Sequence, residues 1–172
     1  PGAAALNPAE LAHWMQDRRQ GIRDRWLSEV KNRGGSTITP PIAALIENLL
    51  DAAITVLPGT LGPFRSSVEP MWRAVAELYG NVATMRGLAS GEAIEEFQLL
   101  REGVIRLLYQ ETGAPGEDGV SLRDLLRLNR AVDRGVTYAS VGYTDSLFFA
   151  LFQGSGVRGE LTPERIQDIE EE

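Results

Sequence analysis

Apolar residues recur at intervals of three and four along most of this chain, and that spacing restricts it to a helical fold. The clearest case is residues 42–57, where the repeat has no miss: Ile42, Leu45, Ile46, Leu49, Leu50, Ala53, Ile54 and Leu57. Such a repeat places apolar side chains on one face of an α-helix. No segment shows the alternating pattern of a strand. The sequence therefore predicts an all-α fold, a single bundle of about five or six helices.

Start and stop signals divide the chain into these helices. Asn7, as an N-cap, and Pro8 open a first helix, which Gly34 and Gly35 end. Later helices are expected over residues 42–57, from about 66, from 90, and from 121 to about 153. The third helix is expected to bury one stripe of residues: Met71, Trp72, Val75, Leu78 and Val82. The last of these helices is long, roughly 45 Å at 1.5 Å per residue.

Residues 1–153 are expected to form one helical domain, because a chain of 172 residues suits a single domain of ordinary size. Residues 154–172 differ in character. They contain the glycine-rich segment GSGVRG and a fresh helix start, with Thr162 as N-cap and Pro163 at the first helical position. We expect a glycine hinge followed by an exit helix that leads to an output domain.

Composition excludes several classes of function. The chain has no cysteine, so it can form neither a disulfide nor a zinc–thiolate site. His13 is its only histidine, which leaves single-histidine haem ligation as a remote alternative and predicts no cofactor or metal. The net charge of −7 argues against a nucleic-acid partner. No apolar run reaches about 18 residues, which predicts no membrane span and a cytoplasmic protein.

The motifs that resemble catalytic signatures lack the context that catalysis requires. Gly154, Gly156 and Gly159 match G-x-G-x-x-G, but no strand precedes them, and a flexible hinge is the better interpretation. Glu95 and Glu96 are adjacent, so they diverge by roughly 100° on a helix and cannot share one substrate. There is no nucleophile elbow and no Walker A loop. The sequence therefore predicts a protein that is not an enzyme.

The long last helix carries a heptad pattern that points to self-association. Apolar residues with one polar interruption recur along it at three-four spacing: Leu125, Asn129, Val132, Val136 and Ala139. Two copies of such a helix can pair in parallel, with a buried asparagine fixing the register. The pattern predicts a homodimer whose seam these residues form and through which a signal is relayed.

A second group of residues suggests either a buried polar contact or a ligand pocket. It consists of Trp26, Trp72, Phe97, Arg101, Tyr109 and Asp133. In the first interpretation, Arg101 pairs with Asn129 or Asp133 inside a helix–helix seam. In the second, the aromatic residues surround a small molecule within the bundle, and the domain is a ligand sensor. The sequence leaves both interpretations open.

Three segments, IRDRWLSEV near the N-terminus, EEFQLLREGVIRLLYQE at residues 95–111 and LRDLLRLNRAVDRGVTYASVGYTDSL after a short linker, resemble a known family. This is the N-terminal domain of RsbRD-type RsbT co-antagonists, relatives of which also precede bacterial sensor histidine kinases. The resemblance implies an all-α sensory or regulatory module, often compared with non-haem globins. It also implies a protein signalling partner or a fused output domain, and a role in bacterial stress-response signalling. It implies no active site.

Overall fold

Six α-helices and one short 3-10 helix form the regular structure of residues 8–33, 38–112 and 122–154, the ranges that the computed structural model describes. In chain order they are α1 (Pro8–Asp17), α2 (Arg19–Asn32), α3 (Pro40–Val56), η1 (Leu57–Thr60), α4 (Arg65–Met85), α5 (Ser90–Thr112) and α6 (Leu122–Gly154). No strand occurs in these ranges. The prediction of an all-α bundle with a long C-terminal helix is confirmed.

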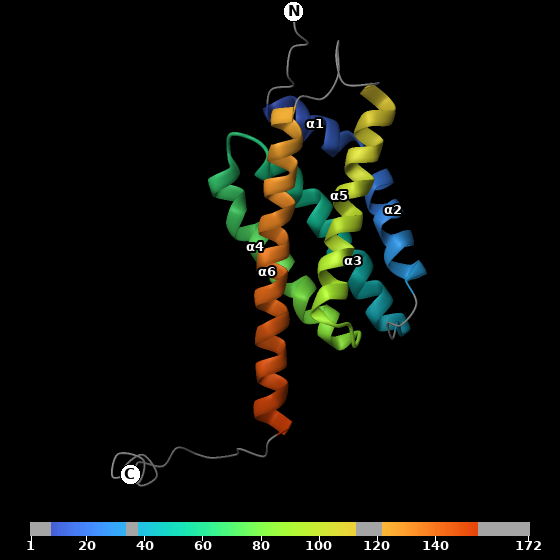
Figure 1. Cartoon of the computed structure of the whole chain (residues 1–172), viewed down its shortest axis with the longest axis vertical. Coiled ribbons are helices and arrows are strands. Elements are labelled where there is room, and N and C mark those ends of the chain that lie inside the picture. The colour runs from blue at the N-terminus through green and yellow to red at the C-terminus, as the bar shows by residue number, and fades with distance from the viewer. Residues whose placement is uncertain (1–7, 34–37, 113–121, 155–172) are drawn as a thin grey trace, which may run out of the picture.

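The helices lie side by side around a main apolar core (Figure 1), and a smaller apolar cluster lies at the α4–α5 turn. α4 descends from the upper end of the molecule, α5 returns upward, and α6 descends again along both of them. α2 packs against the other side of α5, α3 packs against α2 and α4, and the short α1 closes the upper end. The last turns of α6 continue beyond all the other helices. Among the described helices, α6 is therefore the one that extends beyond the bundle.

The first predicted helix is in fact two helices, broken at Arg18. The amide of Arg18 donates to the carbonyl of Met15, 3.2 Å away, and so skips the carbonyl of Trp14. That carbonyl instead accepts a hydrogen bond from the Arg18 guanidinium at 3.3 Å. Arg18 and the Trp14 indole also both donate to the carboxylate of Glu111 on α5. The Arg18 side chain thus replaces one backbone hydrogen bond at the break, and its contact with Glu111 links the break to α5.

The buried face of α4 agrees with the prediction in part. Trp72 and Val82 are buried as predicted and Val75 packs against the core, whereas Met71 and Leu78 are exposed. Ala76 and Tyr79, which were not predicted there, are buried instead. Part of the buried face of α4 consists of small residues, because α6 approaches it closely. Apolar spacing in the sequence does not reveal such positions, which is why the prediction failed there.

α4 and α6 cross in direct backbone contact. A Cβ atom built on Gly80 would lie 1.9 Å from the carbonyl oxygen of Ala139, and one built on Gly142 would lie 1.9 Å from that of Glu77. No side chain fits at either position. The two glycines therefore let these helices approach more closely than an ordinary interaxial distance of about 8–10 Å permits.

The turn between α4 and α5 has a defined geometry. Gly87 adopts a left-handed conformation, with φ of 74°. Its amide bonds to the carbonyl of Thr84 at 3.0 Å, and the amide of Leu88 bonds to that of Ala83 at 3.1 Å, which is a Schellman motif. Glu92 in turn accepts from the amide of Ala89 at 2.7 Å and caps the start of α5. This turn fixes the position of Arg86, just before the glycine.

One segment corrects the expectation that no apolar run is long enough to cross a membrane. Within the described residues, Pro40–Thr60 has the length and composition of a span, with a mean hydropathy of 1.5 in its best window. Core helices of soluble proteins pass the same test, and α3 contributes Ile46, Leu50 and Ile54 to the core of this bundle.

Candidate functional site

The predicted aromatic residues meet at the centre of the bundle. The ring centroid of Phe97 lies 5.8 Å from that of Trp26 and 6.3 Å from that of Trp72. Tyr79, which was not predicted here, lies 5.1 Å from Phe97 and stacks on Trp26 at 5.6 Å. Each indole also finds a backbone acceptor: Trp26 donates to the carbonyl of Glu96 at 2.7 Å, and Trp72 to that of Ala131 at 3.0 Å.

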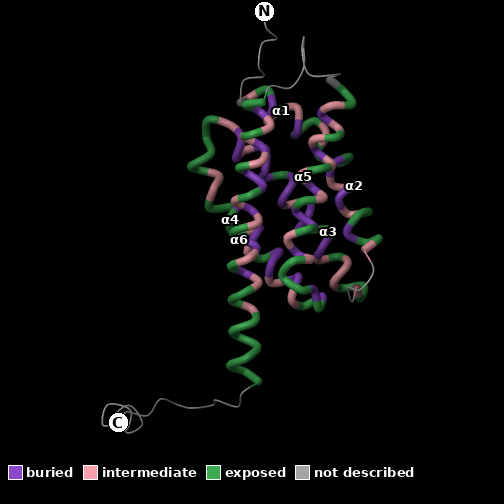
Figure 2. Tube along the Cα trace, in the orientation of Figure 1, coloured by how far each residue is buried: buried purple, intermediate pink, exposed green. Residues whose placement is uncertain are grey.

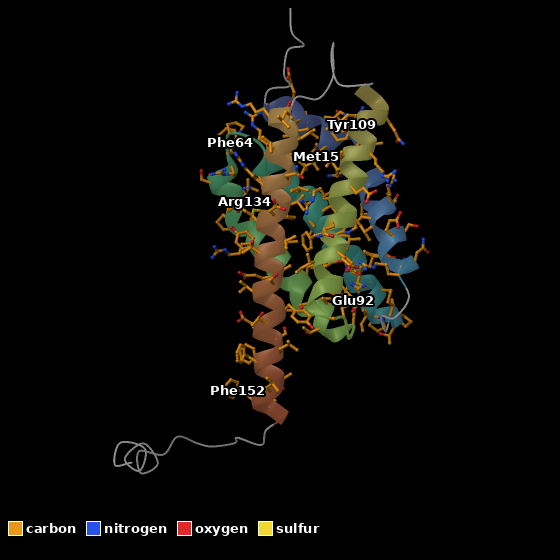
Figure 3. The ribbon with its side chains drawn as sticks, viewed as in Figure 1. Met15, Phe64, Glu92, Tyr109, Arg134 and Phe152 are labelled. Carbon is orange, nitrogen blue, oxygen red and sulfur yellow. The ribbon has the colours of Figure 1, made fainter. Side chains whose placement is uncertain are left out.

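These rings pack against one another at the place where the second interpretation puts a ligand pocket. Trp26, Trp72 and Phe97 are buried against one another and contribute to the core. Tyr109 lies apart from them, because 12 residues of α5 separate it from Phe97, about 18 Å along the helix; Figure 3 shows it near the upper end of α5. A cavity beside these rings, which Trp26, Gly103 and Leu107 help to line, has a volume of about 170 Å³. That is below the usual range of about 300–1,000 Å³ for a ligand site.

The polar residues of the predicted pocket form a contact between α5 and α6. Arg101 Nη1 lies 3.2 Å from the Asp133 carboxylate, and the two side chains are 27% and 58% exposed. Of the two partners that the sequence allowed for Arg101, the structure selects Asp133. This ion pair lies at the surface, where such pairs are weak.

Charged groups are nevertheless buried, at a place that the sequence did not indicate. Arg86 and Glu96 are each 1% exposed. The guanidinium donates to both carboxylate oxygens, at 2.6 and 2.7 Å, and the Tyr79 hydroxyl donates to the same carboxylate. Arg86 Nε is buried without a partner among the described residues. The forked pair joins the α4–α5 turn to the middle of the core.

The protonation states of this network follow from its surroundings. Burial, reinforced by the charge of Glu96, raises the pKa of Tyr79 well above its ordinary value. Burial lowers the pKa of Arg86, but its hydrogen bonds to Glu96 and the charge of that carboxylate outweigh burial and leave the pKa raised. Tyr79 therefore stays a neutral donor and Arg86 a cation at physiological pH, so neither side chain exchanges a proton there. The arrangement fastens helices together.

The predicted dimer seam is corrected by the burial of its residues. Val132 and Ala139 are fully or almost fully buried, and both belong to the core of this chain. Leu125 and Val136 pack against the same core and Asn129 is half-buried. The heptad pattern of α6 therefore matches packing against α4 and α5, which takes up Val132 and Ala139 fully and the other three residues in part.

A different part of α6 is apolar and exposed. Leu147, Phe148, Phe149, Leu151 and Phe152 expose between 44% and 69% of their surface. They lie on the turns that extend beyond the other helices, where Figure 2 shows the chain exposed throughout. We call residues 147–154 the projecting end of α6. Large contiguous apolar surfaces of this kind are uncommon on monomeric soluble proteins.

The exposed apolar face is on the opposite side of α6 from the core. Val141, Thr144, Phe148 and Leu151 follow one another at intervals of three, four and three. Phe148 is nine residues beyond buried Ala139, which places it about 180° around the helix. A shallow groove that Ser140, Val141 and Thr144 help to line continues this face along the bundle. α6 therefore has an inner face for its own core and an outer face without an occupant in the described residues.

The other predicted features have simple locations. His13 is exposed on α1. Gly154 ends α6, whereas Gly156, Gly159 and the helix start at Thr162 lie outside the described residues. Within residues 8–33, 38–112 and 122–154, no cluster of three histidine, cysteine or acidic side chains is placed to hold a metal ion.

The fold and the two faces of α6 define an all-α bundle with a projecting apolar helix. Comparison with protein-family models, with curated proteins and with solved structures finds no match to this chain. The resemblance to the RsbRD-type N-terminal domain stays a prediction from the sequence pattern, as does the comparison with non-haem globins.

Proposed function

We propose that this chain is a non-catalytic N-terminal sensory or regulatory domain of a cytoplasmic bacterial signalling protein. In this proposal it belongs to a histidine kinase or a stress-response regulator, forms a homodimer and relays a signal through α6. The observation that carries the proposal is the exposed apolar face at the projecting end of α6. The resemblance to RsbRD-type domains supplies the bacterial signalling context.

The spacing of that face favours a second copy of α6 as its partner. Residues at intervals of three, four and three form the contact stripe of a two-stranded coiled coil. Pairing there leaves the core of each bundle undisturbed, because the core lies on the opposite face.

A relay follows from the same placement. α6 contacts the core along its inner face and then leaves the bundle as a continuous helix. A change in packing around α4 and α5 therefore reaches the projecting end without crossing a loop. Shifts of about 1–2 Å in interface helices are a known way in which proteins switch.

Sedimentation equilibrium of the whole chain tests the dimer. We expect a dimer for the natural sequence and a folded monomer for Phe148→Glu combined with Leu151→Glu, because paired glutamates repel one another in the contact. Met71→Glu is the matched control, since Met71 is equally exposed but lies on α4; it should remain dimeric. A natural chain that is monomeric at high micromolar concentration, or a double variant that still dimerises, contradicts the proposal.

A further inference from the structure

A cavity at the upper end of the bundle is lined by four arginines. It has a volume of about 370 Å³ and lies between the start of α4 and the first turns of α6. Arg65 comes from α4, and Arg127, Arg130 and Arg134 come from α6. Figure 3 shows Arg134 on α6 beside α4, and Phe64, which precedes Arg65, above it. We call this the arginine pocket.

Two of these four charges are already compensated. Arg127 Nη1 lies 3.2 Å from the buried carboxylate of Asp124, and Arg134 Nε lies 2.7 Å from that of Glu69. Arg65 and Arg130 are exposed and form no ion pair within the described residues. The pocket therefore carries a local charge near +2, although the chain as a whole carries −7.

A bound anion would relieve the repulsion that remains in this arrangement. Arg127, Arg130 and Arg134 lie at intervals of three and four on one helix, and like charges at that spacing destabilise a helix by about 0.2–0.5 kcal/mol per pair. Arg65 is the first residue of α4, where the helix dipole disfavours a cation. The N-cap residue, Phe64, makes no side-chain hydrogen bond to the start of that helix. Both helices thus place positive charge where a bound anion stabilises it.

We propose that the arginine pocket binds a small phosphate-bearing anion of charge near −2. Arginine suits phosphate because its planar guanidinium donates two parallel hydrogen bonds to two phosphate oxygens. Arg65 and Arg130 are the primary ligands, while Arg127 and Arg134 add a weaker contribution because each shares its charge with a carboxylate. Ser66, in the first turn of α4, lines the same cavity and supplies a hydroxyl. The volume lies within the range of small-ligand sites.

The site is separate from the proposed dimer contact. Arg130 and Leu151 are 21 residues apart on α6, about 30 Å along the helix. Binding of an anion can therefore be measured whether the chain is a monomer or a dimer. Failure of one proposal leaves the other unaffected.

Isothermal titration calorimetry with inorganic pyrophosphate tests the site in the whole chain. We expect saturable binding at one site per chain, weakened by added salt because the contact is between charges. The combined variant Arg65→Gln, Arg130→Gln should bind at least tenfold more weakly. Arg19→Gln is the matched control, because Arg19 is also exposed and forms no ion pair within the described residues; its affinity should be unchanged.

A second variant separates phosphate recognition from charge alone. Arg65→Lys with Arg130→Lys keeps both charges but removes the forked donors, and we expect its affinity to fall severalfold. Three results would overturn the proposal: no saturable binding of pyrophosphate at low-millimolar concentration, equal binding by the glutamine variant, or equal affinity for citrate. Circular dichroism confirms that each variant keeps its helical fold. The mutated residues are exposed, so loss of folding is not expected.

Discussion

Glu95 and Glu96 are neighbours in the chain but lie in opposite environments. Glu95 is exposed and pairs with Arg33 at the surface. Glu96 is buried and holds the forked contact with Arg86. A surface ion pair contributes about 0–1 kcal/mol, whereas breaking a buried pair leaves an uncompensated charge in the core. Of these two adjacent carboxylates, Glu95 therefore contributes little to the stability of the fold, whereas Glu96 contributes much more.

We therefore expect Glu96→Gln to destabilise the fold by about 3–5 kcal/mol. The amide keeps the shape of the carboxylate but removes the charge opposite Arg86 and adds a donor facing a donor. Glu95→Gln is the control and should cost at most about 1 kcal/mol. Urea unfolding followed by circular dichroism measures both. Equal losses in the two variants would mean that the buried pair contributes no more than a surface pair.

The sequence predicted that these two carboxylates diverge, because adjacent residues on a helix point about 100° apart. It did not predict that Glu96 enters the core. Its partner, Arg86, lies in the turn between two helices, outside any periodic pattern, and Gly87 and the Schellman motif fix its position. Contacts of this kind depend on the turn geometry, which the apolar spacing does not encode.

At the scale of elements, two glycines inside helices have different reasons to be there. A Cβ at Gly103 would meet the Arg25 side chain at 3.6 Å, an ordinary contact. A Cβ at Gly135 would lie 2.5 Å from Cζ2 of Trp72 and 3.0 Å from Cε1 of Phe97. Gly135 therefore makes room for the aromatic cluster, whereas Gly103 has space for a methyl group.

We expect Gly103→Ala to stabilise the chain by about 0.5–1 kcal/mol, because alanine favours the helix. Gly135→Ala gains the same helix propensity but overpacks the core, and we expect a net loss of about 1–3 kcal/mol. Thermal unfolding of the two variants measures the difference. A change of the same sign in both would show that the aromatic cluster can yield to a methyl group.

Helical periodicity predicted the extent of α3, α5 and α6 closely, because each has a continuous apolar stripe. It failed where a contact between elements decides the structure. The break at Arg18 depends on Glu111 of α5, and the buried face of α4 depends on backbone contact with α6 at Gly80. Neither Glu111 nor α6 can be recognised from the sequence of the segment whose structure it determines.

At the scale of the whole molecule, the heptad in α6 was correct as a packing pattern but assigned to the wrong partner. Three-four spacing shows that a helix face is covered and does not distinguish a neighbouring helix from a second copy. Val132 and Ala139 are covered by the chain itself. The proposed dimer contact therefore moves to the outer face of the same helix, and of that face the sequence analysis had named no residue.

A single cysteine tests the geometry of that dimer, since the natural chain has none. In a parallel dimer in register, Leu151→Cys places two thiols opposite each other, within the separation of about 4.4–6.8 Å between Cα atoms that a disulfide needs. We expect mild oxidation to give a cross-linked dimer on a non-reducing gel. Met71→Cys, exposed on α4, is the control and should stay monomeric on the gel. Equal cross-linking in both would indicate random collision, and none at Leu151 would exclude parallel pairing there.

The contact at Gly80 and Gly142 sets the kind of motion that α6 can make. With backbone against backbone, α6 cannot slide along α4 without collision of main-chain atoms. α6 can tilt relative to α4, and it then rotates about the point where Gly80 and Gly142 bring the two helices into contact. The 12 residues from Gly142 to Gly154 form a lever arm of about 18 Å, so a tilt of about 5° moves its end by about 1.5 Å. The glycine contact therefore opposes sliding of α6 along α4 and leaves tilting about the crossing as the motion that it permits.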